Sequence, residues 1–377
     1  MAHLKPFRAL RYDTRRAGPL ETLVAPPHDV ISPDLRDRLL AASPYNVVRL
    51  LHPDSPADAA RALDAWKGSG VLVREIDPAV WLLEEEFPGP DGMPHTRRGL
   101  VVRIRLEPYA AGVVFPHERT VGRQREARLA LLRAVRTKLS PVLLLHEGQP
   151  PEPTPGRPPE LEVEFDGVTS RLWRITDPAE RGRALARVRG AVIIADGHHR
   201  YETALRLHQE EGTAETAYLL AALVSRNDPG VVIFPTHRVA SGRVPELNGR
   251  FHVTTLDGGA IEALDRLRRV PRDRPAFVVL RREGAVLAEA DPERGPLGVL
   301  DTTALAQLPL EDVRYTPSAA EAERAVRSGS ASAAFLVRAP TIEQVEAVAL
   351  AGETMPEKST YFFPKLTSGL LFAPLDE

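Results

Sequence analysis

Cysteine is absent from the 377-residue chain. Without thiols there is no disulfide bond, no cysteine nucleophile and no zinc site built on thiolates. An excess of charge of one sign is also lacking: the net charge is -2, and so no overall basic field attracts nucleic acid or an acidic membrane. No apolar run reaches the length of a membrane-spanning helix, and the N-terminal residues lack the apolar core of a signal peptide. We therefore expect a cytoplasmic protein that binds a small molecule and neither nucleic acid nor membrane.

Lysine is scarce, with five lysines against 44 arginines. Where arginine is the default cation, a retained lysine indicates a site that needs a compact ammonium group. Two of the five occur in EKSTYFFPKL, which contains Lys358, Ser359, Thr360 and Lys365. This run can bind phosphate through its ammonium, hydroxyl and backbone groups. It can also be a C-terminal strand pair that packs its aromatic residues into the core, and both readings hold together if alternate residues face opposite sides.

The chain is long enough for two domains, each with its own core. The proline-rich residues 148–160 serve either as a domain boundary or as a long hairpin loop within one domain. We place one α/β region at residues 1–150 and a second at residues 151–377. Strands and helices alternate irregularly in both, which predicts an α+β fold of the mixed α/β kind.

Hydrophobic periodicity locates the individual elements. Helices are expected at residues 55–70, where Ser55 is the N-cap, and at residues 125–139. The apolar runs at residues 45–51 and 230–239 are expected to be strands.

The sequence ADGHHRYETAL follows a short apolar run and leads into residues with helical spacing. Five polar or small residues therefore lie where a buried strand ends and a helix begins: Asp196, Gly197, His198, His199 and Arg200. Unpaired backbone N–H groups and the positive end of the helix dipole suit an anion at such a position. Glycine allows close backbone approach, the histidines add donors, and arginine binds phosphate in a bidentate way. The run thus predicts a phosphate-binding turn.

Asp196 in this turn is expected to hold magnesium rather than to contact phosphate directly. Zinc is disfavoured, because adjacent histidines point apart and the spaced pairs usual for zinc are absent. A simpler alternative stays open, in which Asp196 caps the helix and the histidines are surface residues.

The segment FPHERT places His117 beside Glu118 ahead of the helix expected at residues 125–139. Glu118 has the chemistry of a general base, with His117 as its partner or as a phosphate ligand. The alternative is a surface loop in which Glu118 forms a local salt bridge.

Two further loops offer a histidine beside a charged residue. VAPPHDVIS presents His28 and Asp29, and FPTHRV presents His237 and Arg238 at the end of an expected strand. We expect these four side chains to contact substrate. For the first loop the alternative is that Ser32 caps the following helix and explains the sequence.

The motifs GxxxxGK[ST], GxGxxG and GxSxG are all missing, so the P-loop, the dinucleotide fold and the hydrolase elbow are not indicated. Instead, seven segments resemble, in order, the bacterial and archaeal domain-of-unknown-function 1015 family: FRALRY, VAPPHDVIS, SPYNVVRL, PHERT, ADGHHRYETA, FPTHRV and MPEKSTYFFPKLTSGL. The resemblance extends over residues 6–372, essentially the whole chain.

The turn at residues 197–200 also resembles the Gly-x-x-Arg phosphate-binding signature of the ParB/sulfiredoxin superfamily. That resemblance implies a ParB/sulfiredoxin-like nucleotide-binding core with additional α/β domains. It implies phosphates of ATP or ADP on the turn, and Asp196 near the metal or the transferred group. His198 stands where sulfiredoxin has its reactive cysteine, so reduction of sulfinic acids is excluded and phosphoryl transfer remains.

Because the superfamily includes free serine kinases, the resemblance implies a small-molecule kinase that uses ATP or ADP with Mg2+. The acceptor would be a hydroxyl-bearing metabolite, with free serine as the leading candidate. Arg200 and a lysine would neutralise the transferring phosphate, and Glu118 or Asp196 would accept the hydroxyl proton. A non-catalytic nucleotide or phospho-metabolite sensor and a phosphatase of a phosphorylated amino acid stay open as alternatives, as does a homodimer.

Overall fold

The computed structural model describes residues 2–89, 92–119, 122–154, 156–247 and 249–376. Contacts between Cα atoms divide the chain into two units. The first unit takes in residues 1–116, 120–232 and 364–377, and the second takes in residues 117–119 and 233–363. This division differs from the predicted one between residues 150 and 151. Most of the second unit is an insertion within the sequence of the first.

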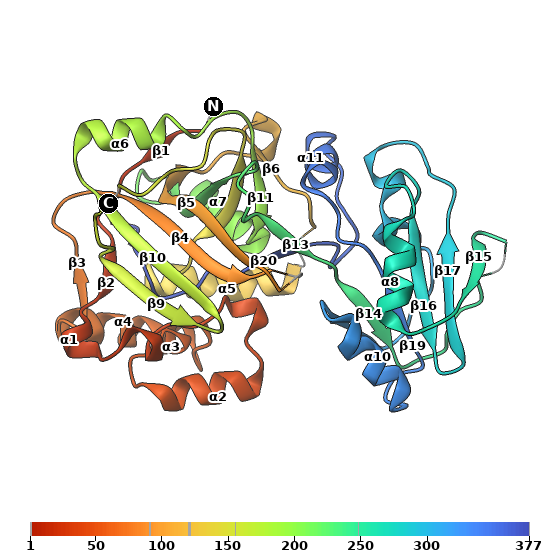
Figure 1. Ribbon diagram of the computed structural model, residues 1–377. Helices are drawn as coiled ribbons and strands as arrows, with labels where there is room; N and C mark the ends of the chain where they lie inside the picture. The colour runs from red at the N-terminus through yellow and green to blue at the C-terminus, as the bar shows by residue number, and fades with distance from the viewer. Residues whose placement is uncertain (1, 90–91, 120–121, 155, 248, 377) are drawn as a thin grey trace. The chain divides into compact units, whose positions relative to one another are not determined.

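A nine-stranded sheet is the largest element of the first unit (Figure 1). Its strands are β1 (Leu4–Lys5), β4 (Val80–Pro88), β5 (Pro94–Arg105), β6 (Val114–Phe115), β8 (Val142–His146), β9 (Leu161–Phe165), β10 (Val168–Ile175), β11 (Val192–Asp196) and β12 (Tyr218–Ser225). Eight of them lie in the order β6-β11-β8-β12-β5-β4-β10-β9, and β1 pairs with β5. Strand β11 is parallel to β6 and antiparallel to β8, while β12 is parallel to β8.

The other elements of the first unit are two small strand pairs and a set of helices. Strand β2 (Leu10–Tyr12) pairs with β3 (Leu72–Arg74), and β7 (Thr137–Lys138) pairs with β21 (Ala373–Pro374). The helices and single 3-10 turns are α1 (Thr14–Ala17), η1 (Leu20–Thr22), η2 (His28–Val30), α2 (Pro33–Ala42), α3 (Val48–Leu51), α4 (Pro56–Gly68), η3 (Tyr109–Ala111), α5 (Gly122–Val135), α6 (Pro178–Leu185) and α7 (His198–Glu211).

Helices α5 and α7 pack on each other, and α7 also packs on β8 and β12. The spacing of apolar residues explains this arrangement: Tyr201, Ala204 and Leu207 recur every third residue on one face of α7 and are buried. They join Leu129 and Leu132 of α5 in the core against the sheet. The packing holds the N-terminal end of α7 firmly beside α5.

Three predictions for the first unit can be compared directly with the structure. The helix expected at residues 55–70 is α4. The N–H of Asp58 in its first turn donates to the Ser55 side chain, which caps the helix as predicted. The helix expected at 125–139 is α5, although it ends at Val135 and the next residues form β7. The strand expected at 45–51 is wrong, because this segment ends in helix α3. A short buried apolar run does not distinguish a strand from a buried helix.

The proline-rich residues 148–160 connect β8 to β9, two strands of the same sheet. Of the two alternatives for this segment, the structure therefore has a loop within one unit. Strand β9 continues into β10 as a hairpin, with Phe165 paired to Val168 across Asp166 and Gly167.

The second unit is built on a six-stranded antiparallel sheet in the order β15-β17-β16-β19-β14-β18. Its elements are β14 (His237–Ala240), β15 (His252–Leu256), α8 (Ala260–Arg268), β16 (Ala276–Arg281), β17 (Gly284–Glu289), η4 (Pro296–Val299), α9 (Asp301–Ala306), β18 (Val313–Thr316), α10 (Ala319–Arg327), β19 (Ala333–Leu336) and α11 (Ile342–Leu350). A separate two-stranded sheet joins β13 (Val232–Phe234) to β20 (Tyr361–Phe363).

Alternate residues of this sheet face different helices, as the period of a strand requires. Val278 and Leu280 of β16 lie in a cluster with α8 and α10. Phe277 and Val279 of the same strand lie in a second cluster with α9. The continuous strand expected at residues 230–239 is instead divided into β13 and β14, with Pro235 between them, because proline cannot donate to a strand ladder.

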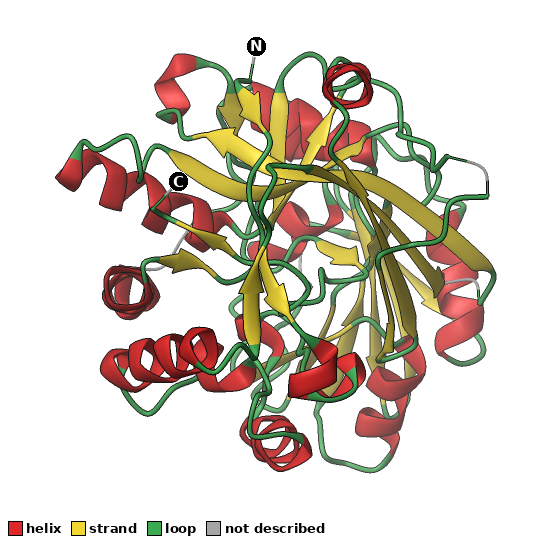
Figure 2. Ribbon diagram, turned by 90° about the vertical axis from the view of Figure 1, so that its left-hand side faces the viewer, coloured by secondary structure: helices red, strands yellow, loops and turns green. Residues whose placement is uncertain are grey.

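The structure is mixed α/β, as predicted (Figure 2, strands in yellow and helices in red). Over the part of the chain that the structure describes, no helix combines the length and the apolar character needed to cross a bilayer.

Candidate anion-binding site

The N-terminal end of α7 presents backbone donors without a capping side chain. Strand β11 ends at Asp196, and Gly197 turns the chain with a φ of 96° into the helix. No side chain caps this position, and the first N–H to bond within the helix is that of Tyr201, to the Gly197 carbonyl at 3.0 Å. The first amides of the helix are thus placed to receive an anion. The predicted strand, turn and helix are confirmed.

Gly197 is required here for a second reason besides its left-handed φ. A Cβ atom at this position would lie 2.9 Å from Nε and Nη2 of Arg200. The absence of a side chain therefore lets the Arg200 guanidinium fold back beside the turn.

Asp196 is held by two cations of the first unit. Its Oδ2 accepts a hydrogen bond from Arg200 at 2.5 Å, and its Oδ1 accepts one from the ammonium of Lys365. Burial raises the pKa of this carboxyl, but Lys365 and Arg200 outweigh burial and hold the pKa well below its usual value. Asp196 is therefore a fixed anion that positions two cations at the turn.

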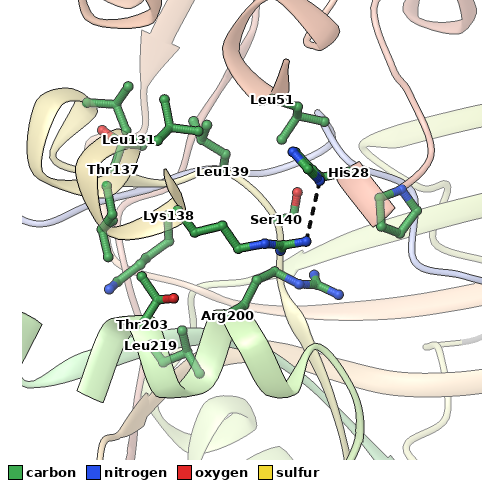
Figure 3. A pocket seen from close by; sticks show the side chains of 14 residues that line it. His28, Leu51, Leu131, Thr137, Lys138, Leu139, Ser140, Arg200, Thr203 and Leu219 are labelled. Carbon is green, nitrogen blue, oxygen red and sulfur yellow. Dashed lines mark hydrogen bonds between the residues drawn. The ribbon is translucent and has the colours of Figure 1, made fainter. Parts of the chain in front are cut away.

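Arg128 of α5 is a partly buried cation without an ion pair among the described residues. Its Nη2 lies 3.4 Å from Nδ1 of His28 (dashed line in Figure 3), and its Nε is buried with no hydrogen-bond partner. Burial, and after it the charge of Arg200, lower the pKa of Arg128. A partly buried charge without an ion pair is costly, and an anion between Arg128 and Arg200 would reduce that cost.

Two histidines lie against this region from the loop VAPPHDVIS and from the end of α3. The rings of His28 and His52 stack with centroids 3.8 Å apart, and Nε2 of His52 lies 2.9 Å from the His28 carbonyl oxygen. Burial, followed by the charge of Arg128, lowers the pKa of His28 to about 4. Burial is also the first cause that lowers the pKa of His52. We therefore expect a neutral pair at pH 7.

This shift predicts a pH dependence of stability. His28 has a folded-state pKa of about 4 against an ordinary value of 6.5, so protons bind more readily to the unfolded chain between these values. We expect the free energy of unfolding to fall by ~1–2 kcal/mol from His28 between pH 7 and pH 5, allowing for its partial exposure. Urea unfolding at both pH values measures the change.

The control for this measurement is His28→Asn, which should lose less stability than the wild-type chain over the same interval. An equal loss in both proteins would show that His28 does not carry the effect.

We call Arg128, Arg200 and Lys365 the cation cluster. Arg200 and Lys365 pair with Asp196, and the charge of Asp196 also acts on Arg128. The positive end of α7 adds to their charge. Such a site has the charge and the donors to receive an anion with several oxygens, and phosphate is the anion that bidentate guanidinium groups and helix amides suit best.

The same arrangement does not suit the magnesium ion predicted at Asp196. Both of its oxygens are engaged by cations, and the described residues contain no group of three histidine, aspartate or glutamate side chains that could hold a metal. The magnesium prediction therefore has no support from these residues.

Other predicted residues belong to the second unit, where two distant motifs meet. His117 Nε2 lies 3.0 Å from Thr360 Oγ1, and the N–H of Met355 donates to the His117 carbonyl at 2.9 Å. Glu118 pairs with Met355 as an isolated parallel bridge. PHERT and EKSTYFFPKL thus lie side by side, which their sequence separation did not indicate.

The remaining predicted residues of this unit have structural contacts of their own. Ser359 donates to the Pro356 carbonyl at 2.6 Å, and Lys358 lies in an exposed left-handed position with a φ of 55°. Nδ1 of buried His237 accepts the N–H of Val337 at 3.2 Å. Their predicted ligand contacts stay predictions.

Arg238 is likewise engaged within the second unit, where it donates to the Thr236 carbonyl at 2.5 Å. Its predicted substrate contact stays a prediction too. Asp29 of the first unit is exposed and raises the pKa of His28 and Arg128 by its charge. His198 is buried, and Nδ1 of His199 is buried with no hydrogen-bond partner in the described structure.

Arg128 and His52 are site residues that sequence reasoning missed. Arg128 stands four residues before Leu132, which faces the core, so helical spacing places it at the edge of the buried face of α5. This helical spacing was the signal in the sequence that could have identified Arg128. His52 gave no signal, because its position follows from the helix α3 that the sequence did not predict.

Several solved structures share a general likeness with the chain. A free serine kinase in complex with AMP has 17% identity and a TM-score of 0.42, over 71% of this chain and 88% of that one. A conserved hypothetical protein from Pyrococcus furiosus has 17% identity and a TM-score of 0.41, over 73% and 95%. A C-terminally truncated SbnI from Staphylococcus aureus has 13% identity and a TM-score of 0.34, over 70% and 84%.

Likenesses at this level assign no activity to the chain. No curated protein matches the sequence. A family model does match, over residues 4–303, and its description is a protein of unknown function, DUF1015.

Proposed function

The chain belongs to the DUF1015 family, and from the site in its first unit we propose a nucleotide-dependent phosphoryl transfer to a small hydroxyl-bearing metabolite. The observation that carries the proposal is Arg128, close to Arg200 at the uncapped start of α7: it has no ion pair among the described residues, and its Nε is buried without a hydrogen-bond partner. For this proposal, the Gly-x-x-Arg resemblance favours free serine as the acceptor. It also favours a ParB/sulfiredoxin-like nucleotide-binding core as the fold.

In the proposed reaction, the amides of α7 and the cation cluster bind the phosphate oxygens of ATP or ADP. The acceptor hydroxyl oxygen forms a bond to the terminal phosphorus, the bond from that phosphorus to the nucleotide breaks, and the hydroxyl proton passes to a carboxylate. Positive groups fixed in advance stabilise the charge that is spread over the transferring phosphoryl oxygens. Arg200 does this directly, and Asp196 positions Arg200 and Lys365.

Asp196 is unsuited to accept the proton, because a carboxyl whose pKa is held well below its usual value is a weak base. Glu118, the other carboxylate predicted for this role, belongs to the second unit, and its role as the base stays a prediction. The roles of Asp196 and Glu118 can be separated by substitution.

The test is product analysis with ATP or ADP and free serine, with and without magnesium. Glu118→Gln should lose at least ~100-fold in turnover and keep its nucleotide affinity, because a general base contributes ~10²–10⁴ to rate. Asp196→Asn should lose affinity as well, because Arg200 and Lys365 lose their positioning partner.

Release of inorganic phosphate from phosphoserine without nucleotide would replace the kinase by the phosphatase alternative. Nucleotide binding with no product from any hydroxyl amino acid would favour the sensor. Full turnover by Glu118→Gln would remove Glu118 from the mechanism.

A further inference from the structure

A pocket of about 100 Å³ lies in the first unit, next to the cation cluster. Arg128 and Arg200 line it, and so do residues of η2, β7 and β12. Figure 3 shows His28 on one side of this pocket and Thr137, Lys138 and Thr203 on the other. The pocket thus extends from the phosphate-binding groups to a region that the proposed reaction does not use.

The walls of this region are mainly apolar. Leu131 and Leu132 of α5 contribute to them, as do Leu139 and Leu219 from neighbouring segments. Apolar walls with a few polar groups are typical of pockets that bind the organic part of a small ligand.

Three polar side chains in these walls lack hydrogen-bond partners among the described residues. Lys138 Nζ, Thr137 Oγ1 and Thr203 Oγ1 are buried, and none has a hydrogen-bond partner among the described residues. The Lys138 side chain belongs to a residue that is only 5% exposed. Because buried polar groups are almost always hydrogen-bonded, three such atoms lining one pocket indicate a ligand that supplies the missing contacts.

Lys138 is suited to donate to a neutral acceptor. Burial, followed by the charges of Arg103 and Arg136, lowers the pKa of Lys138 to about 7. None of the described residues that line the pocket is a carboxylate, so the ligand need not bring a positive charge. It needs an acceptor for Lys138 and a group that a threonine hydroxyl can bind.

We propose that this pocket binds the adenine base of the nucleotide whose phosphates lie on the cation cluster. The proposal rests on the proposed function, which it extends by naming the base and the residues that recognise it. Lys138 donates to a ring nitrogen, and a hydroxyl of Thr137 or Thr203 accepts from the exocyclic amine. The leucine side chains pack on the faces of the ring.

Guanine fits this donor set less well. Its N1–H and N2 amine are adjacent donors, which a carboxylate or a pair of carbonyl acceptors matches best, and the described lining residues include no Asp or Glu. Adenine has three ring nitrogens that accept hydrogen bonds and one amine that donates them. These groups match the amine of Lys138 as a donor and the hydroxyls of Thr137 and Thr203 as acceptors.

The experiment is calorimetric titration of the full chain with AMP, GMP, ribose 5-phosphate and inorganic phosphate. AMP should bind at least tenfold more tightly than GMP and ribose 5-phosphate. Lys138→Met should weaken AMP binding at least tenfold and leave ribose 5-phosphate unchanged. Lys67→Met is the matched control, because Lys67 lies on α4 with a half-exposed side chain near Asp64 and should leave all four affinities unchanged.

Thr203→Val provides a second variant that keeps the shape of the side chain, and it should weaken AMP in the same selective way. Equal binding of AMP and ribose 5-phosphate by the wild-type chain would overturn the base pocket and leave the phosphate site standing. Unchanged AMP binding by both Lys138→Met and Thr203→Val would also overturn the base pocket and leave the phosphate site standing. Failure of every phosphate compound to bind would instead refute the proposed function.

Discussion

Arg200→Ala should strongly reduce the thermal stabilisation that ATP or ADP gives to the wild-type protein. Arg200 is the guanidinium that Asp196 fixes beside the α7 amides, so its loss removes a charge-assisted contact to phosphate. Such a contact contributes ~1.5–3 kcal/mol, which corresponds to a ~10- to 150-fold weaker affinity. A thermal-shift series with ATP, ADP, phosphate, serine and phosphoserine, with and without magnesium, measures the loss.

Arg206→Ala is the matched control for this substitution. Arg206 lies on the same helix, and its side chain is 46% exposed and pairs with Glu210 at 3.0 Å. It should leave the nucleotide shift intact. An unchanged shift in Arg200→Ala would remove the central contact of the proposed site.

Arg128→Met should act in opposite directions on stability and on binding. Without a ligand, Arg128 is a partly buried cation with no ion pair among the described residues, and its Nε is buried without a partner, so methionine should raise the free energy of unfolding by ~1 kcal/mol. The same change should weaken phosphate and nucleotide binding at least tenfold, because one cation of the cluster is lost. Denaturant unfolding and titration of the same protein give the two values.

A loss of stability together with unchanged binding would show that Arg128 has a structural role only. Arg133→Met is the control on α5, since Arg133 is half exposed and pairs with Glu210. Arg133→Met should neither raise the free energy of unfolding nor weaken phosphate and nucleotide binding.

The sequence predicted the α7 turn well because everything that defines it is local. An apolar run, a glycine and helical spacing occur within a few residues, and they specify a strand, a left-handed turn and a helix. Local sequence gave a wrong prediction at residues 45–51. The apolar run there is too short to show a period, and it ends in the helix α3.

The partners of the turn could not be predicted, because they come from distant parts of the chain. Lys365 stands 169 residues after Asp196, and pairing with it makes Asp196 a poor base and an unsuitable metal ligand. The meeting of His117 with Thr360 is a similar case, with 243 residues between them. Charge and spacing mark such residues as candidates, but only the fold shows which of them meet.

The position of Lys365 has a consequence for the order in which the protein is made. During translation, Asp196 and Arg200 leave the ribosome together, whereas Lys365 follows only after residues 233–363 of the second unit. Strand β21, which pairs with β7 beside the pocket, is also synthesised after that unit. The nascent first unit therefore holds its anion site unfinished while the inserted unit is being synthesised, and the site becomes complete among the last events of biosynthesis.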